Sequence, residues 1–252
     1  MNEIFSRNIM YWGEEVQQEI GNKHVAVFGL GGVGGYAAEA LVRAGIGEIT
    51  LIDFDEVSKT NINRQLVALN STVGQKKIEL FKSRLLDINP ELKINIFDKF
   101  YDNNINNEIF AQKIDYVVDA IDTMRAKVDL LVYCKQNNIP VFSSVGAGNR
   151  IDPTKLYIAD LSECTKPNCS FVKNLVHNLK KFNIQNGITC VFSNEKPKKP
   201  INKEFGYIKN GENVIKKFSP SSTPFVPPVA GYMLAFALIN LIVKNLDKKH
   251  TK

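Results

Sequence analysis

Short apolar runs alternate with segments of helical periodicity from Arg7 to Gly148. The runs are HVAVFG, EITLID, KINIFD, DYVVDAI and PVFSSV, and the segments that predict helices are Arg7–Ile20, Gly34–Ala44, Lys76–Asp87, Ile105–Gln112 and Met124–Asn137. Apolar runs of this length are typical of strands that helices cover on both faces. We therefore predict an α/β fold with a Rossmann-like, doubly wound, mostly parallel sheet and helices on both faces.

The pattern is looser after Gly148. LYIAD and ITCVFS predict strands, Ser170–Phe182 predicts a helix, and Asn210-Gly211 predicts the turn of a hairpin between FGYIK and NVIKKF. The stretch 194–228 is rich in Lys, Pro, Ser and Asn, and we expect it to be mobile. Because a last apolar helix must return to cover the sheet, we predict one domain over 1–252, with a core over 1–148 and a second half over 149–252.

The last apolar segment, Phe225–Val243, approaches the length of a membrane span without a single charge. Pro227 and Pro228 are expected to precede the helix, which leaves Val229 to about Val243. A helix that is apolar all round is also typical of a protein core. We favour a buried helix and expect no stable membrane insertion.

Composition places the chain among globular proteins. Its 252 residues are 44% hydrophobic and include only 16 Gly and 10 Pro, which excludes disordered and collagen-like chains. The cysteines are few and scattered: Cys134, Cys164, Cys169 and Cys190. The start, MNEIFSRNIMYWGEE, lacks the basic and apolar regions of a secretory signal. We expect a reducing, cytoplasmic compartment.

Charge is divided unevenly along the chain, whose net charge is +6. The residues up to Ala126 carry a net charge of −5, and those from Lys127 onward carry +11. Such asymmetry can mark a half that binds nucleic acid. A solvated, lysine-rich surface would give the same pattern, so charge alone leaves both interpretations open.

A glycine-rich turn joins the first strand to the next helix in VAVFGLGGVGGYAAEAL. Its glycines include Gly29, Gly31, Gly32 and Gly34. The first permits a tight turn, the middle ones let a phosphate approach the backbone, and the last lets helix and strand pack closely. Asp53 ends the second strand and is placed to accept hydrogen bonds from a ribose. The sequence therefore predicts a nucleotide site.

The residues after the second strand indicate which nucleotide binds. They include Asn61, Arg64 and Gln65 in TNINRQ, and Lys77 in VGQKK. A hydride-transfer enzyme needs a smooth nicotinamide pocket here, whereas a triphosphate needs cations near its β and γ phosphates. We therefore predict ATP. The alternatives are a surface ion pair for Arg64 and a solvated side chain for Lys77, which has Lys76 beside it.

Two carboxylates end the fourth strand, where open α/β sheets bind their ligands. Beside a triphosphate, a carboxylate is either repelled or bridged by Mg²⁺. We assign the Mg²⁺ to Asp122. For Asp119 two alternatives stay open: it caps the following helix or pairs with Arg125.

The motifs GLGGVG, DFDEVSKTNINRQ, VGQKK and DAID together resemble the ThiF-like family of ubiquitin-activating enzymes and bacterial sulfur-carrier relatives. In that family a substrate carboxylate attacks the α-phosphate of ATP, giving an acyl adenylate and pyrophosphate. The resemblance implies that Asp53 holds the ribose, that Asn61, Arg64, Gln65 and Lys77 hold the phosphates, and that Asp122 holds Mg²⁺. It makes Arg64, Lys77 and Asp122 the catalytic residues. Arg7 matches an arginine that reaches the nucleotide of the other subunit, which implies a homodimer.

The second half distinguishes between branches of this family. Cys164 and Cys169 have no second cysteine pair, so we expect no structural zinc. VFSSVGAGNRIDPTKLYIADLS, GITCVFSNEKP and FVPPVAGYMLA resemble segments of the tRNA threonylcarbamoyladenosine dehydratases. The resemblance implies a substrate tRNA whose threonyl carboxylate is adenylated and then cyclised. Sulfur-relay proteins remain a further partner class, and Cys190 is either a nucleophile or, in our favoured interpretation, a buried inert thiol.

This substrate would explain the basic second half, whose expected phosphate contacts are Arg150, Lys155, Lys173, Lys180, Lys181, Lys198 and Lys199. Two alternative functions remain. One is activation of the C-terminal carboxylate of a ubiquitin-like sulfur carrier, and the other is dinucleotide binding without adenylating chemistry.

Overall fold

A computed structural model of the protein describes residues 3–164, 169–201, 205–210, 213–218 and 220–250. The parallel core consists of β1 (His24–Phe28), α3 (Gly34–Ala44), β2 (Glu48–Ile52), α4 (Lys77–Ile88), β3 (Lys93–Phe97), α5 (Asn106–Ile109), β4 (Tyr116–Asp119), α6 (Met124–Gln136) and β5 (Val141–Ser144). The second half adds β6 (Leu156–Asp160), α7 (Ser170–Lys180), β7 (Thr189–Ser193), β8 (Phe205–Asn210), β9 (Asn213–Phe218) and α8 (Val226–His250). Every strand predicted from the sequence is present, and so is the hairpin.

Seven strands form one sheet in the order β3-β2-β1-β4-β5-β7-β6. All neighbours are parallel except β6, which pairs antiparallel with β7 at the edge. The chain proceeds outward from β1 in one direction and from β4 in the other. The strand order therefore reverses between β1 and β4, and this point is where doubly wound sheets bind ligands at their carboxyl ends.

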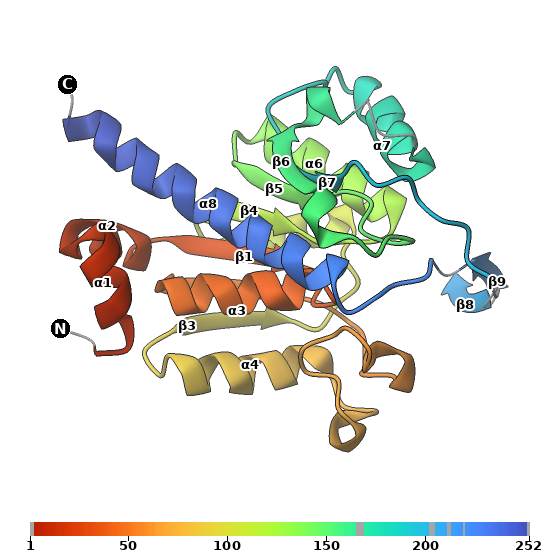
Figure 1. The fold of residues 1–252 in the computed structure, drawn as a ribbon, viewed down its shortest axis with the longest axis horizontal. Coiled ribbons are helices and arrows are strands. Elements are labelled where there is room, and N and C mark those ends of the chain that lie inside the picture. Colours follow the sequence, from red (N-terminus) through yellow and green to blue (C-terminus); the bar gives the residue numbers. More distant parts are fainter. Residues whose placement is uncertain (1–2, 165–168, 202–204, 211–212, 219, 251–252) are drawn as a thin grey trace.

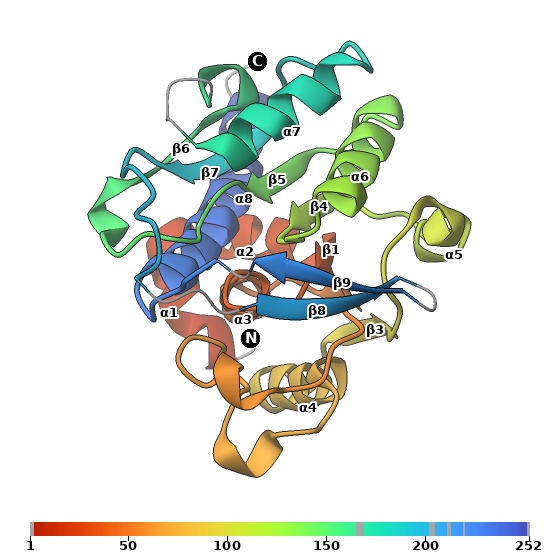
Figure 2. The same cartoon turned by 90° about the vertical axis from the view of Figure 1, so that its right-hand side faces the viewer.

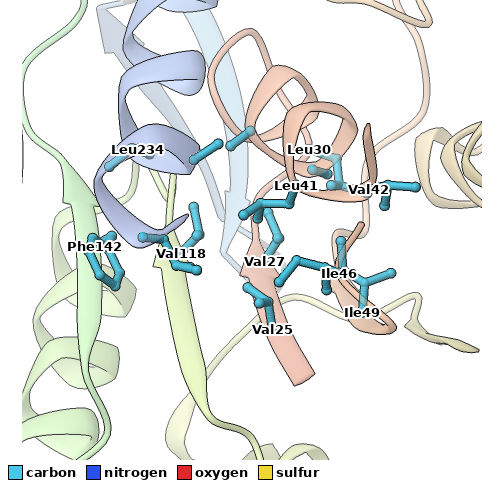
Figure 3. Close-up of a cluster of buried hydrophobic side chains, with 14 of the residues drawn as sticks. Val25, Val27, Leu30, Leu41, Val42, Ile46, Ile49, Val118, Phe142 and Leu234 are labelled. Atoms are coloured by element: carbon cyan, nitrogen blue, oxygen red, sulfur yellow. The ribbon is translucent and has the colours of Figure 1, made fainter. Parts of the chain in front are cut away.

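Helices cover both faces of the sheet, as predicted (Figure 1). One buried cluster packs α3, α4 and α8 against the sheet, and Figure 3 shows Val27 and Val118 of the sheet together with Leu41 of α3 and Leu234 of α8. A second cluster packs α6 and α7 against the opposite face. The two clusters fix the strand ends on which the site is built.

The last helix differs from its predicted bounds. Pro227 and Pro228 lie in the first turn of α8, where a missing backbone N–H costs little, and they do not precede the helix as expected. In the described part of the chain α8 alone has the length and apolarity of a membrane span, and most of that span is buried within the protein. Val226, Ala230 and Leu238 are inaccessible to solvent, as the prediction of a core helix requires.

The amino-terminal helix also differs from the prediction. The single helix expected over Arg7–Ile20 is two helices, α1 (Ser6–Trp12) and α2 (Glu14–Gly21), after a short 3-10 turn over Glu3–Phe5. They are separated at Gly13, whose φ of +85° lies outside the helical region. The apolar periodicity continues through this position, so it did not reveal the break.

The β8–β9 hairpin stands apart from the sheet (Figures 1 and 2). Its strands pair antiparallel from Phe205 with Phe218 to Asn210 with Asn213, which confirms the predicted hairpin. It extends from the side of the molecule that carries the carboxyl ends of the parallel strands. The expected mobility of the stretch 194–228 stays a prediction.

Candidate nucleotide-binding site

A cavity of about 340 Å³ lies at the carboxyl ends of β1, β2 and β4. Its walls include Gly29, Gly31, Gly32, Asp53, Asp55, Arg64, Gln65, Lys77, Ile121 and Asp122. The volume suits a small-molecule ligand, and the position is the switch point of the sheet. Asn61 and Gly34 of the predicted set do not line the cavity, and Arg7 lies elsewhere in the molecule.

The glycine turn connects β1 directly to α3. The N–H of Gly35 donates to the carbonyl of Gly31 at 3.2 Å, so the first helical turn already forms above the loop. A Cβ at Gly34 would lie 1.8 Å from the carbonyl oxygen of Gly29, which only glycine avoids. Gly34 thus packs the helix against the strand, and a helix N-terminus in this position is a favourable site for an anion.

Asp53 is buried and holds the glycine turn in place. Its carboxylate accepts hydrogen bonds from the N–H of Leu30 at 2.5 Å and the N–H of Asp55 at 2.8 Å. Burial raises the pKa of Asp53, and the charge of Lys77 and the two N–H donors oppose that rise. Each carboxylate oxygen keeps a second lone pair, so Asp53 can position the loop and accept a ribose hydroxyl at the same time.

Lys77 begins α4 and places its ammonium group at the cavity. Its side chain is 4% exposed and donates to Asp55 at 2.8 Å, while the side chain of Asp55 is 48% exposed. Lys76, in contrast, lies toward solvent and contacts Asp98 at 3.3 Å. The structure thus distinguishes the two lysines: Lys77 is the one that faces the cavity.

Arg64, which follows β2, and Asp122, which follows β4, both line the cavity. Arg64 is half-buried, and its guanidinium donates to the carbonyl of Thr60 and the side chain of Asn63. Burial lowers the pKa of Arg64, and the negative charge of Asp122 opposes this shift. Asp122 is exposed and accepts a bond of 3.3 Å from the hydroxyl of Thr123. Its carboxylate is accessible to a ligand.

Gln65 and Asn61 follow the same loop but differ in position. Gln65 is 8% exposed and lines the cavity, and its buried Oε1 has no hydrogen-bond partner among the described residues. An unsatisfied buried acceptor beside a cavity fits a ligand that brings hydroxyl or amino donors. Asn61 instead accepts from the N–H of Ser58 at 3.1 Å and closes the turn that presents Arg64.

Asp119 is neither a helix cap nor a partner of Arg125. Its side chain is fully buried, contacts the ammonium of Lys127 at 2.5 Å and accepts from the hydroxyl of Ser143 at 2.7 Å. It also accepts from the N–H of Ile121 at 3.1 Å, next to Asp122. The sequence analysis did not identify Lys127. Its position among the apolar residues on the inward face of α6 could have predicted that it is buried.

Aromatic residues form a part of the cavity that the sequence analysis did not identify. Phe54 and Phe100 meet edge to face with ring centroids 5.1 Å apart, and both are about half exposed. Lys99 and Tyr101 line the same wall. These residues follow β2 and β3. Because the ends of parallel strands meet at one edge of the sheet, their positions in the sequence could have predicted this wall. Apolar rings with open faces suit a flat heterocyclic base.

The second half completes the cavity with Pro220, Ser222 and Pro227, which lie with Gly148 at the end of the core. Arg150, expected to bind phosphate, is 4% exposed, and its guanidinium donates to the carbonyls of Gly146, Gly148 and Glu195. These bonds occupy the guanidinium inside the protein, which argues against a phosphate contact. Lys155, Lys173, Lys180, Lys181, Lys198 and Lys199 are exposed.

The cysteines are buried in the described structure. Cys190 is inaccessible to solvent in the middle of β7, and a hydrogen bond with Cys164 together with burial raises the pKa of its thiol. This supports an inert thiol and argues against a nucleophile. Among the described residues, no group of three or more His, Cys, Asp or Glu is arranged to hold a metal ion.

Arg7 lies far from the cavity of its own chain. It is exposed on α1, and the side chain of the next residue, Asn8, donates to the carbonyl of Arg43 at the end of α3. The cavity lies at the opposite end of α3. Arg7 therefore cannot reach the nucleotide site of the same subunit.

Comparisons with known proteins agree with this geometry. Over 254 aligned residues the chain is 42% identical to the tRNA threonylcarbamoyladenosine dehydratase of Bacillus subtilis (strain 168), covering 98% of both chains. The crystal structure of the Escherichia coli tRNA N6-threonylcarbamoyladenosine dehydratase in complex with ATP matches with a TM-score of 0.86 and 32% identity, over 98% of this chain and 96% of that one.

A shorter match links the chain to another branch. It is 33% identical to the molybdopterin-synthase adenylyltransferase of Escherichia coli (strain K12), over 59% of each chain. The sequence profile of the ThiF family, in contrast, matches residues 5–252. With the glycine turn, the buried aspartate and the Arg64–Gln65 loop around one cavity, the chain belongs to the ThiF family.

Proposed function

We propose that this protein is an ATP-dependent tRNA threonylcarbamoyladenosine dehydratase. It activates the threonyl carboxylate of the modified adenosine by adenylation and closes it to the cyclic nucleoside. The observation that supports this most is the 42% identity to a dehydratase over nearly the full length of both chains, together with a cavity built for a nucleotide. The match to the adenylyltransferase covers only 59% of the chain.

Different cavity residues bind different parts of ATP. The first turn of α3 and the glycine loop hold the phosphates, and Asp53 fixes this loop while accepting from the ribose. Lys77 and Arg64 bring two cations to the phosphates, where they stabilise the charge that develops on the leaving pyrophosphate. The unsatisfied acceptor of Gln65 takes a donor from the nucleotide.

Asp122 would hold Mg²⁺ together with the phosphates of the nucleotide. Magnesium sites of this kind use one or two carboxylates plus the substrate phosphates, so a single exposed carboxylate at the cavity suffices. The ion neutralises phosphate charge when bound. Asp119 holds the backbone of Ile121 and so keeps Asp122 directed at the cavity.

The protein acts as a homodimer in the cytoplasm, where its tRNA substrate occurs. Arg7 is too far from its own cavity, so it reaches the nucleotide of a second copy. Exposed apolar side chains on α1 and α8, including Met10, Tyr11 and Phe236, offer a surface for that copy. Mixing Arg7→Ala subunits with Arg64→Ala subunits should restore activity, because one of the two sites in a mixed dimer then has both arginines.

The exposed lysines of the second half hold the tRNA backbone. Lys155, Lys180, Lys181, Lys198 and Lys199 are exposed and belong to the half that carries a net charge of +11. Arg150 is not among them, because its guanidinium is bound within the protein. A sulfur-relay partner stays a prediction.

Mass spectrometry of tRNA nucleosides tests this function directly. Purified protein is incubated with ATP, Mg²⁺ and tRNA that carries threonylcarbamoyladenosine, and the nucleosides are then analysed. We expect the modified nucleoside to lose one water, and we expect no change without ATP or with Arg64→Ala. If the nucleoside stays intact while the protein adenylates a ubiquitin-like carrier, the sulfur-carrier function is correct instead.

A further inference from the structure

The segment 220–223 runs along one wall of the nucleotide cavity and is held by two asparagines from different parts of the chain. Pro220 and Ser222 line the cavity. The side-chain amide of Asn63, one residue before Arg64, donates to the carbonyl of Ser222 at 3.0 Å. Asn149 holds the same segment from the other side. We call residues 220–223 the rim.

Asn149 makes three hydrogen bonds to a single rim residue. Its N–H donates to the carbonyl of Ser221 at 2.7 Å, and its Oδ1 accepts from the N–H of Ser221 at 2.8 Å and from the hydroxyl at 2.9 Å. Its φ of +62° is left-handed, which is uncommon outside glycine and which asparagine tolerates best. Such strained positions concentrate at functional segments.

The loop that carries Asn149 is itself rigidly held. Arg150 donates to the carbonyls of Gly146, Gly148 and Glu195, and the carbonyl of Asn149 accepts from the N–H of Lys198 at 2.9 Å. The buried guanidinium therefore makes this loop a fixed base for the rim.

The rim connects two functional regions. It follows β9, which ends at Phe218, and it leads into α8, whose Pro227 lies at the cavity. A Cβ on Gly32 would lie 3.2 Å from Pro227, so this part of the chain closely approaches the glycine turn. The rim and the glycine turn therefore line the same cavity.

We propose that Asn149 and Asn63 are positioning residues that fix the rim so that it directs the carboxylate of the tRNA nucleoside toward the bound nucleotide. This inference rests on the proposed function. Neither asparagine lines the cavity, and Asn63 in addition accepts from the guanidinium of Arg64 at 2.8 Å. They act on the RNA substrate through the backbone of Ser221 and Ser222.

Asn149→Gly tests the inference with a matched control. Glycine keeps the left-handed backbone but loses the Oδ1 acceptor. Asn138 also has a positive φ, +55°, but lies in the exposed turn after α6 at the other end of the sheet, so Asn138→Gly makes the same backbone change away from the cavity. Steady-state kinetics give kcat and KM for modified tRNA and for ATP.

We expect Asn149→Gly to lower kcat/KM for modified tRNA about thirtyfold, the factor that two net hydrogen bonds represent. The KM for ATP stays as in the wild type, and Asn138→Gly changes neither. Asn149→Asp keeps an acceptor and should restore most of the rate. Ser221→Ala, which removes only the hydroxyl bond, gives a smaller loss in the same direction and serves if Asn149→Gly fails to fold.

Two results would overturn the inference. Either Asn149→Gly and Ser221→Ala behave like Asn138→Gly, or they impair ATP binding as much as tRNA turnover. If the wild type itself leaves the modified nucleoside intact, the proposed function fails, and this outcome is visible before any variant is compared.

Discussion

Two lysine–aspartate pairs lie at the carboxyl edge of the same sheet and differ in access to solvent. Lys127 and Asp119, 2.5 Å apart, are both fully buried between α6, β4 and β5. Lys77 and Asp55, 2.8 Å apart, share the wall of the cavity, and Asp55 is about half exposed. The two pairs have the same chemical groups at similar distances.

Access to solvent determines whether the lysine of each pair can bind a ligand. The ammonium of Lys127 has all its contacts within the protein, with Asp119, Ser143 and the carbonyl of Ser144. It cannot exchange a partner for a ligand without exposing a buried charge. The ammonium of Lys77 has a half-exposed partner, so a ligand in the cavity can replace that partner at little cost. The buried pair therefore stabilises the fold, and the open pair is available to a ligand.

The largest effect is expected from Lys127→Met. Removing one member of a buried pair leaves the other charge uncompensated, which costs about 3–5 kcal/mol of unfolding free energy. Urea denaturation measures this loss. The control is Arg125→Met on the same helix, whose side chain is 93% exposed, and it should change stability by less than about 0.5 kcal/mol. If the two variants are equally stable, the buried pair does not stabilise the fold and the two pairs do not differ as described.

Lys77→Met, in contrast, should reduce the rate of adenylation more than the stability of the fold. Loss of a cation at the phosphates removes about 3 kcal/mol of transition-state stabilisation. The unfolding free energy falls by only about 1 kcal/mol, because the partner is solvated. The same variant removes a charge that opposes the rise in the pKa of Asp53. Pyrophosphate formation in the presence of modified tRNA measures the rate, and Lys76→Met, whose side chain faces solvent, is the control.

Asp122→Asn tests a cavity carboxylate for which the described residues provide no lysine partner. The amide keeps the shape of the side chain but loses the charge that holds Mg²⁺. We expect the Mg²⁺ concentration for half-maximal rate to rise about tenfold, which corresponds to about 1.4 kcal/mol. ATP binding should change less. An unaltered magnesium titration would remove Asp122 from the metal site.

The smallest effect per residue is expected from lysines that face solvent altogether. Changing Lys180, Lys181, Lys198 and Lys199 to Gln removes four exposed charges that we propose to contact RNA phosphates, and none of them lines the cavity. Each lost contact should reduce the slope of log affinity against log salt by about 0.7–0.9. Filter binding of tRNA at several salt concentrations measures the slope. If slope and affinity stay the same while ATP binding is normal, these lysines are merely solvated.

The fold class, most elements and the place of the site follow from the order of residues along the chain. The strands from His24–Phe28 to Val141–Ser144 follow from their apolar runs, because a covered parallel strand needs an apolar residue at nearly every position. The glycine turn and Asp53 indicated the switch point because the ends of parallel strands meet at one edge. These are properties of neighbours along the chain.

Which charges are available to a ligand depends on contacts between remote segments. Arg150 looks like other basic residues in the sequence, yet its guanidinium is buried and donates to a carbonyl as distant along the chain as that of Glu195. The rim depends on Asn63 and Asn149 meeting Ser221 and Ser222 across some 70 to 160 positions. A side chain's burial and partners arise from contacts between remote segments, and local periodicity does not encode them.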